Sequence, residues 1–257
     1  MGNKPIIKDP QAISFMREGG KKLVDIFKVI KTFVRPGVSL KELDQIAREE
    51  CVKHNSKPAF LNYQGYPAAI CTSVNEGVVH CIPDDYKLQE GDLISIDFGL
   101  KYKGYYTDST ISLIVGKDIN NLKPLIRSVY EALMSGTKQI TDNVTVETIS
   151  AAIEKSLLKD NLTIMRQFVG HGIGQDLHED PMVPNFVSHD RKVQLPAGSV
   201  IAIEPIAGPG AESYITASDG WSIRTADKKP VAHLEHTVAV TKDGYEILTP
   251  IKEIIDL

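Results

Sequence analysis

Four carboxylates and one imidazole in the sequence are of the types that could hold divalent metal ions. Asp97 and Asp108 occur in one expected β-hairpin, whereas Glu204 and Glu235 occur in later strand-like segments. His171 is flanked by glycines, which leave room for a ligand close to the backbone. This mostly hard donor set suits Mn²⁺, Fe²⁺, Co²⁺ or Zn²⁺ better than a thiolate site would. Two such ions that share bridging carboxylates can bind one water between them and lower its pKa, so the pattern indicates a two-metal hydrolase.

The hairpin register that we predict brings the first two carboxylates together. The predicted loop is residues 101–104, and Asp97 then lies directly opposite Asp108, with Cβ atoms about 5 Å apart. Alternation along the strands places polar residues on one face and apolar residues on the other. The predicted polar face carries Ser95, Asp97, Asp108, Thr110 and Ser112. The predicted apolar face, which we expect to be buried, carries Ile94, Ile96, Phe98, Ile111, Leu113 and Val115.

Two adjacent carboxylates repel one another, so something must offset their charge. Water can solvate both, one of them can be protonated, or a cation can lie between them. For an isolated hairpin, solvation is the favoured explanation. Glu204 and Glu235 change this balance, because four carboxylates that project into one interior cannot all stay ionised without metal. A lone histidine is more often a hydrogen-bonded core residue, so His171 becomes a candidate ligand only beside these carboxylates.

The helices and strands that could position these residues follow one another in two similar series. Apolar residues at spacings of three and four predict a helix over residues 13–33. Ser39, with Glu42 three residues later, forms a capping box that starts a second helix. The second half repeats this plan, with one helix over residues 122–140 and another that begins at Thr145. Strand-like segments are expected near residues 69–79, 92–115, 162–169, 200–204, 221–225 and 232–240.

The two series also match residue by residue, which predicts an internal duplication. Residues 88–97 and 195–204 share one pattern of leucine, glycine and aliphatic residues, and each segment ends in a carboxylate. The alternative is coincidence, because glycine followed by aliphatic residues is common before any strand. We expect a single domain over residues 1–257, with pseudo-repeats at about 11–116 and 122–250. The two hairpins would then face each other across a pseudo-twofold axis, with their carboxylates at the seam.

Composition narrows the classes of partner. The 257 residues carry a net charge of only −4, which gives no electrostatic reason to expect nucleic acid or an anionic membrane. No apolar run of about 18 residues occurs, so we expect no membrane span. The three cysteines include no CxxC pair, and free thiols fit a reducing cytosol. No signal-peptide core opens the chain, and we expect a cytoplasmic protein.

The motifs resemble those of the type I methionine aminopeptidases. The shared stretches are Cys71–Pro83, Asp97-Phe98-Gly99, Tyr106-Thr107-Asp108, Gly170–Gly174, His178-Glu179-x-Pro181, Glu204-Pro205 and Glu235-His236-Thr237. The resemblance extends from the first helix to Glu246 and is closest to the compact bacterial form. It implies an α+β class and the pita-bread fold, in which two helix–helix–hairpin units surround a mainly antiparallel curved sheet.

The resemblance also implies roles for the candidate residues. Asp97 would chelate one metal, Asp108 and Glu235 would bridge both, and His171 and Glu204 would complete the other site. Glu204 would also carry a proton to the leaving amine. The catalytic histidines would be His80, near the scissile amide, and His178, beside the substrate backbone. The two divalent ions would be Co, Mn, Fe or Zn, and the sequence does not distinguish among them.

The same resemblance implies a pocket for a methionine side chain. Apolar and aromatic walls suit an unbranched thioether, and a small site favours a small second residue. The expected walls are Phe60, Tyr63, Tyr66, Cys71, Leu177 and Trp221. Phe60 and Leu177 differ from many relatives, which carry a small residue and Phe at these positions. Of the remaining histidines, His54, His189 and His233 are expected to be structural or exposed, and His236 is expected to make a core hydrogen bond.

The resemblance implies removal of the initiator methionine from nascent polypeptides by a monomer, with the ribosome exit tunnel as a further partner. One rival is an X-Pro peptidase of the same fold, although those enzymes usually carry an extra N-terminal domain. A second rival is a metal-free binding protein that kept the fold and lost the chemistry. Such proteins typically lose ligands, and all five candidate ligands are present here.

Overall fold

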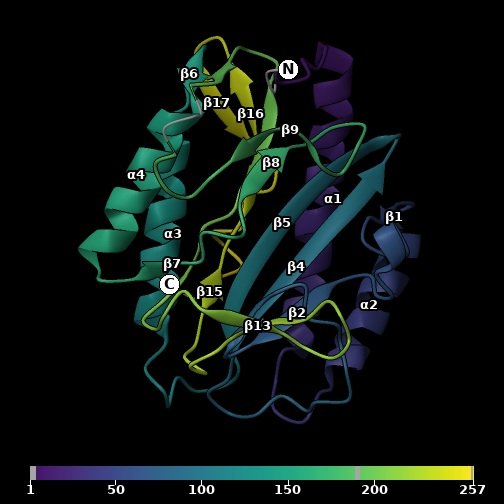
Figure 1. Ribbon diagram of the computed structural model, residues 1–257. Helices are drawn as coiled ribbons and strands as arrows, with labels where there is room; N and C mark the ends of the chain where they lie inside the picture. Colours follow the sequence, from purple (N-terminus) through teal and green to yellow (C-terminus); the bar gives the residue numbers. More distant parts are fainter. Residues whose placement is uncertain (1–3, 189–191, 256) are drawn as a thin grey trace.

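Two long antiparallel strands dominate the first half of the molecule. The structure is a computed structural model, and it describes residues 4–188, 192–255 and 257. β4 (Leu93–Tyr102) and β5 (Tyr105–Ile114) pair along their whole length. On the other side of β4, β1 (Lys57–Pro58) and β2 (Cys71–Val74) pair with its two ends. In Figure 1, α1 and α2 lie beside this hairpin, and α3 and α4 lie on the opposite side of the molecule.

The four α-helices begin and end close to where the sequence predicts. Their bounds are α1 Pro10–Phe33, α2 Leu40–Lys53, α3 Lys123–Thr137 and α4 Val146–Lys159. The capping box at Ser39 and Glu42 is confirmed, because each side chain bonds the other residue's backbone N–H. Thr145 caps α4 in the same way by accepting from the N–H of Thr148.

The remaining strands are short. In the first half, β3 is a strand at Gly77–Val79, and a 3₁₀ turn, η1, lies at Tyr63–Gly65. In the second half they are β6 Val144–Thr145, β7 Thr163–Ile164, β8 Gly170–Gly172, β9 Glu179–Val183, β10 Gln194–Leu195, β11 Val200–Ile203, β12 Ile206–Gly208, β13 Tyr214–Thr216, β14 Ile223–Thr225, β15 Ala232–His233, β16 His236–Thr241 and β17 Gly244–Ile247. The largest sheet of this half has the order β17-β16-β11-β8-β9, and all of its pairs are antiparallel.

The predicted register of the β4–β5 hairpin is wrong by two residues. Tyr102 pairs with Tyr105, so the loop contains two residues rather than four. Lys103 and Gly104 both have positive φ (47° and 89°), as a tight hairpin turn of matching twist requires. Asp97 therefore faces Thr110, and Asp108 is its diagonal neighbour. A shift of two residues keeps every side chain on its face, so the prediction that the two aspartates share a face is confirmed.

Three further strand predictions need correction. The segment 232–240 is not one strand, because Leu234 and Glu235 lie between β15 and β16. The break lets β15 pair with β12 while β16 pairs with β11. The strand-like segment near 162–169 forms a strand only at Thr163–Ile164, and the one near 221–225 forms a strand only at Ile223–Thr225.

The two halves meet where β5 runs beside the start of β16. The N–H of Glu235 donates to the carbonyl of Thr110 (3.1 Å), and the hydroxyl of Ser109 donates to the carbonyl of Glu235 (2.7 Å). The Thr237 hydroxyl accepts from the N–H of Asp108 (2.9 Å) and donates to its carbonyl (2.7 Å). These four hydrogen bonds, which we call the seam, hold Glu235 next to the polar face of the first hairpin.

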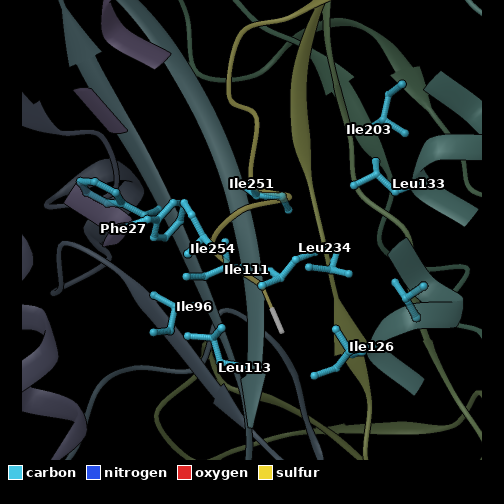
Figure 2. Close-up of a cluster of buried hydrophobic side chains, with 14 of the residues drawn as sticks. Phe27, Ile96, Ile111, Leu113, Ile126, Leu133, Ile203, Leu234, Ile251 and Ile254 are labelled. Atoms are coloured by element: carbon cyan, nitrogen blue, oxygen red, sulfur yellow. The ribbon is translucent and has the colours of Figure 1, made fainter. Parts of the chain in front are cut away.

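The hydrophobic core lies on the other face of the same hairpin. Figure 2 shows Phe27 of α1 near Ile96 of β4, and Phe27 also packs edge-on against Phe98 with ring centroids 5.9 Å apart. Ile111 and Leu113 of β5 continue this core toward the second half. All of the predicted apolar-face residues are buried, as the alternation predicts. In the described part of the chain, none of the helices is both long and apolar enough to span a membrane.

Candidate metal centre

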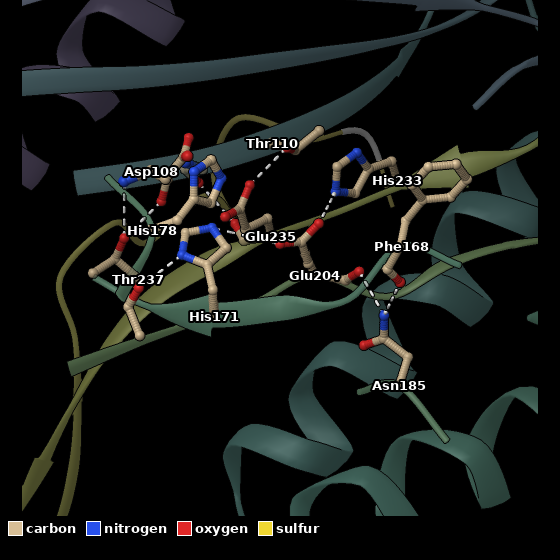
Figure 3. Close-up of polar contacts among 12 residues, drawn as sticks. Asp108, Thr110, Phe168, His171, His178, Asn185, Glu204, His233, Glu235 and Thr237 are labelled. Carbon is tan, nitrogen blue, oxygen red and sulfur yellow. Dashed lines mark hydrogen bonds and ion pairs between the residues drawn. The ribbon is translucent and has the colours of Figure 1, made fainter. Parts of the chain in front are cut away.

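The four carboxylates and His171 line one cavity. The carboxylates are Asp97 of β4, Asp108 of β5, Glu204 just after β11 and Glu235 at the seam, and they share the cavity wall with His171 of β8. Strands or strand ends from both halves of the chain therefore supply one site. Figure 3 shows Asp108, His171, Glu204 and Glu235 directed toward a common point. The predicted convergence of these five residues is thus present in the structure.

The centre of this cluster has the dimensions of a metal site. Asp108, His171 and Glu235 each offer a ligand atom, and these three atoms lie within 4.8 Å of one another. All three residues are buried. Two carboxylates and an imidazole at this spacing could surround one divalent ion, and Asp97 and Glu204 flank them with further oxygens.

Burial leaves some of these oxygens without partners. One carboxylate oxygen of Asp97 and one of Glu235 are fully buried and accept no hydrogen bond. Burial raises the pKa of Asp97 to about 7. Burial, together with the neighbouring carboxylates, raises the pKa of Asp108, Glu204 and Glu235 well above the usual range. A cation of hard character would satisfy these oxygens and let the carboxylates ionise, so the donor set fits divalent metal.

A backbone hydrogen bond orients the imidazole of His171 for metal binding. Its Nδ1 lies 2.8 Å from the carbonyl of Gly172, so it carries the proton and donates to that oxygen. Nε2 is then left as the free ligand atom, the arrangement usual for metal-bound histidine. Burial, with a smaller contribution from the nearby His178, lowers the pKa of His171 to about 3, so the ring stays neutral. Nε2 faces Oε1 of Glu204 at 3.7 Å.

Glu235 is oriented by the first hairpin. The hydroxyl of Thr110, which is fully buried, donates to Oε2 of Glu235 at 2.8 Å. This bond leaves Oε1, the oxygen without a partner, directed into the cluster. Thr110 therefore belongs to the support of the site, although it cannot itself be a strong ligand.

Replacing Thr110 with Val should lower metal affinity by roughly 10- to 100-fold, the usual cost of losing a group that orients a ligand. Val keeps the size and branching of Thr but cannot donate to Glu235. Calorimetric titration of the metal-free protein with Mn²⁺ measures the effect. Thr110→Ser keeps the hydroxyl and is the matched control. Equal affinities of the Val and Ser variants would show that the hydrogen bond does not matter.

The expected methionine pocket opens onto the same cluster. Its predicted walls all line the cavity, which has a volume of about 170 Å³, and they are Phe60, Tyr63, Tyr66, Cys71, Leu177 and Trp221. Tyr66 and Trp221 pack edge to face, with ring centroids 5.2 Å apart. Phe60 is held against Gly99, where an added Cβ would come within 2.7 Å of its ring. An apolar compartment of this size next to polar ligands is typical of a small-molecule or side-chain pocket.

His80 and His178 stand at the exposed rim of the cavity. The hydroxyl of Tyr63 is 2.9 Å from Nδ1 of His178, and the rings of His171 and His178 lie 4.3 Å apart. His80 has a positive φ of 57°, a strained conformation for a residue with a side chain and one that is concentrated at functional sites. The structure therefore places both predicted histidines beside the candidate metal centre.

Sequence reasoning overlooked part of the site. His233, which was expected to be structural or exposed, is buried, and its Nε2 lies 3.7 Å from Oε2 of Glu204. The signal was its position two residues before Glu235, which a single unbroken strand would place on the same face as that ligand. His236 makes the expected core bond, to the carbonyl of Thr249 (2.8 Å). His54 is partly exposed, and His189 lies outside the described residues.

A comparison with protein-family models shows the family to which this chain belongs. The model of metallopeptidase family M24 matches residues 14–242. The chain belongs to metallopeptidase family M24. Its M24 membership makes it a hydrolase that uses divalent metal, which agrees with the buried carboxylate cluster. The resemblance found in the motifs of the sequence is therefore confirmed.

Individual M24 relatives are similar over almost the whole chain. Methionine aminopeptidase 1 of Bacillus subtilis (strain 168) is 39% identical over 244 residues, which is 95% of this chain and 98% of that protein. The crystal structure of methionine aminopeptidase from Rickettsia prowazekii superposes with a TM-score of 0.93 at 34% identity, covering 96% of this chain and 100% of that one. These matches confirm the pita-bread fold.

A more distant M24 structure shows the fold alone. The Xaa-Pro dipeptidase from Bacillus anthracis is 23% identical, with a TM-score of 0.77. The match covers 98% of this chain but only 64% of that one. The match therefore spans about two thirds of the dipeptidase.

Proposed function

We propose that this M24 protein removes the N-terminal methionine from polypeptides and prefers a small second residue. The observation that carries the proposal is that the apolar compartment and the five candidate ligands line the same cavity. The curated M24 relatives that match nearly the full chain are named methionine aminopeptidases, which supports the same reaction. The methionine side chain would enter the compartment lined by Tyr66 and Trp221, and the scissile bond would lie beside the carboxylates.

The proposed metals are two divalent ions drawn from Mn²⁺, Fe²⁺, Co²⁺ and Zn²⁺. Asp97 would hold one, Asp108 and Glu235 would bridge both, and His171 and Glu204 would hold the other. When bound, such ions polarise the scissile carbonyl and lower the pKa of water. The oxygens without partners on Asp97 and Glu235 support this assignment, because a cation satisfies both.

The proposed catalytic groups act on the substrate and its protons. Glu204, at the polar end of the cavity, would take a proton from the attacking water and pass it to the leaving amine. His80 would hydrogen-bond near the scissile amide from the rim. His178, with its ring held by the hydroxyl of Tyr63, would bind the substrate backbone and the charge that develops there.

A peptide panel tests the proposed specificity. Metal-loaded protein should cleave Met-Ala-Ser at least about 100-fold faster than Leu-Ala-Ser, because a branched side chain fits the flat walls of the pocket poorly and a misfit of a few kcal/mol corresponds to this ratio. Release of free amino acid, measured with Mn²⁺ and with Co²⁺, gives the rates. Equal turnover of the two peptides would reject the preference for methionine.

The peptide panel and a metal-uptake measurement distinguish two other functions. Cleavage of Ala-Pro peptides in place of Met-Ala-Ser would identify an X-Pro peptidase. The distant Xaa-Pro dipeptidase shares the fold, but it carries additional chain. Absence of metal uptake in calorimetry and elemental analysis would identify a metal-free binding protein.

We further propose that the chain acts as a cytoplasmic monomer and meets its substrates near the ribosome exit tunnel. The three cysteines are free and buried, which is compatible with a reducing compartment. We also infer one catalytic domain built from two related units, at about residues 11–116 and 122–250. Two helices followed by an antiparallel strand pair in each half, with caps at Ser39 and Thr145, support this duplication.

A further inference from the structure

His233 is a buried histidine that none of the assigned roles uses. Its side chain is 2% exposed, and Nε2 is buried without a hydrogen-bond partner. The atom that this nitrogen faces is Oε2 of Glu204, at 3.7 Å, and Figure 3 shows the two side chains directed toward each other. Leaving a buried polar nitrogen unpaired costs free energy. The Glu204 carboxylate is the adjacent group that can pair with it.

The backbones of both residues are fixed by separate contacts. The N–H of His233 donates to the hydroxyl oxygens of Ser95 (3.3 Å) and Ser112 (3.2 Å), and the Ser112 hydroxyl donates to the His233 carbonyl (2.7 Å). The side-chain amide of Asn185 donates to the carbonyl of Glu204 at 2.9 Å. The fold therefore imposes the approach of the two side chains, and only their torsions are free to adjust.

We propose that His233 positions Glu204 by donating a hydrogen bond from Nε2–H to Oε2. The inference rests on the proposed metal centre, of which Glu204 is a ligand. Each oxygen of this carboxylate then has its own neighbour, because Oε1 lies toward Nε2 of His171 and Oε2 lies toward His233. The terminal torsion of a glutamate is broad, so a small rotation brings Oε2 within hydrogen-bond distance.

The direction of the bond follows from the chemistry of a metal ligand. A carboxylate that binds a cation is ionised and can only accept hydrogen bonds. Nε2 of His233 must therefore carry the proton, and a neutral ring then has a bare Nδ1. The donor would hold Oε2 on the His233 side and leave Oε1, on the His171 side, available to a cation. His233 is a positioning residue in this scheme and does not contact the substrate.

Two substitutions separate the donor from the shape of the ring. His233→Leu fills the space but cannot donate, and we expect Zn²⁺ affinity to fall by roughly 10- to 100-fold, with a similar fall in kcat and little change in KM. His233→Gln keeps an N–H donor on a side chain of similar reach, and it should recover most of the affinity. His236→Leu is the matched control, because it removes an equally buried imidazole that bonds the carbonyl of Thr249 rather than a carboxylate.

Nitrogen-15 NMR of the Zn²⁺-loaded wild-type protein supplies a test that needs no variant. We expect His233 in the Nε2–H tautomer. The Nδ1–H tautomer would overturn the proposal, and so would His233→Leu with unchanged affinity or His233→Gln as weak as His233→Leu. Wild-type protein that takes up no Zn²⁺ would reject the metal centre itself and this role with it. Zn²⁺ uptake with the Nε2–H tautomer but no cleavage of Met-Ala-Ser would reject only the proposed reaction.

Discussion

Replacing Asp108 with Asn should lower kcat/KM for Met-Ala-Ser by roughly a thousandfold, since several kcal/mol of transition-state stabilisation depend on the charge of the metal site. Asp108 lies at the centre of the cluster, within 4.8 Å of the ligand atoms of His171 and Glu235. Asn preserves the size of the side chain, removes the charge and replaces one acceptor oxygen with an NH2 donor. Initial rates over a series of Mn²⁺ concentrations, up to saturation, measure the loss.

The stability of the same variant distinguishes a lost charge from a damaged fold. Without metal, three other buried carboxylates repel Asp108, so metal-free Asp108→Asn at about pH 8 should melt a few degrees above metal-free wild type. Addition of Mn²⁺ should stabilise the variant much less than the wild type. A metal-free variant that is both inactive and less stable than wild type would mean that Asn disrupts the seam instead.

Removal of metal should make the stability of the wild-type protein depend strongly on pH. Burial raises the pKa of Asp97 to about 7, and burial together with the neighbouring carboxylates raises the pKa of Asp108, Glu204 and Glu235 well above the usual range. In the unfolded chain these groups titrate near pH 4. Between these unfolded-state and folded-state pKa values the folded state binds more protons than the unfolded state, so the free energy of unfolding falls as pH rises from about 4 to about 7.

Thermal melts with and without Mn²⁺ test this expectation. The Tm of the metal-free protein should fall by more than about 5 °C between about pH 5 and pH 8, because each group with a raised pKa contributes in the same direction. The Tm of the Mn²⁺-loaded protein should not fall, since metal binds the ionised carboxylates more tightly as pH rises. Parallel curves with and without metal would show that the cluster is already neutralised by some other group.

The secondary structure that depends on local signals was predictable from the sequence. The capping box at Ser39, the cap at Thr145 and the spacing of apolar residues locate the helices, because each signal acts within a few residues. Alternation likewise assigned the correct face to Asp97 and Asp108. The turn was not predictable in the same way, because its length depends on Lys103 accepting a positive φ, for which Lys has no intrinsic preference.

Contacts between distant segments were harder to predict. The sequence contains Glu235 as a candidate ligand, but the strand break that turns it toward Asp108 arises from pairing with two different partners, β11 and β12. The approach of His233 to Glu204 depends on Ser95, Ser112 and Asn185, which lie far away in the sequence. The spacing of His233 and Glu235 indicates a shared strand face, but a single sequence carries no local signal for the residue that His233 meets there.

The seam has a consequence for how the protein acquires and exchanges its ions. Its four hydrogen bonds place Asp108 and Glu235 side by side through backbone atoms and the hydroxyls of Ser109 and Thr237, none of which is a candidate metal ligand. The cage is therefore preorganised by the chain, and an incoming ion has little ordering entropy to offset. Because carboxylate and imidazole ligands accept several first-row divalent ions, the availability of each metal would decide which ion the cage holds.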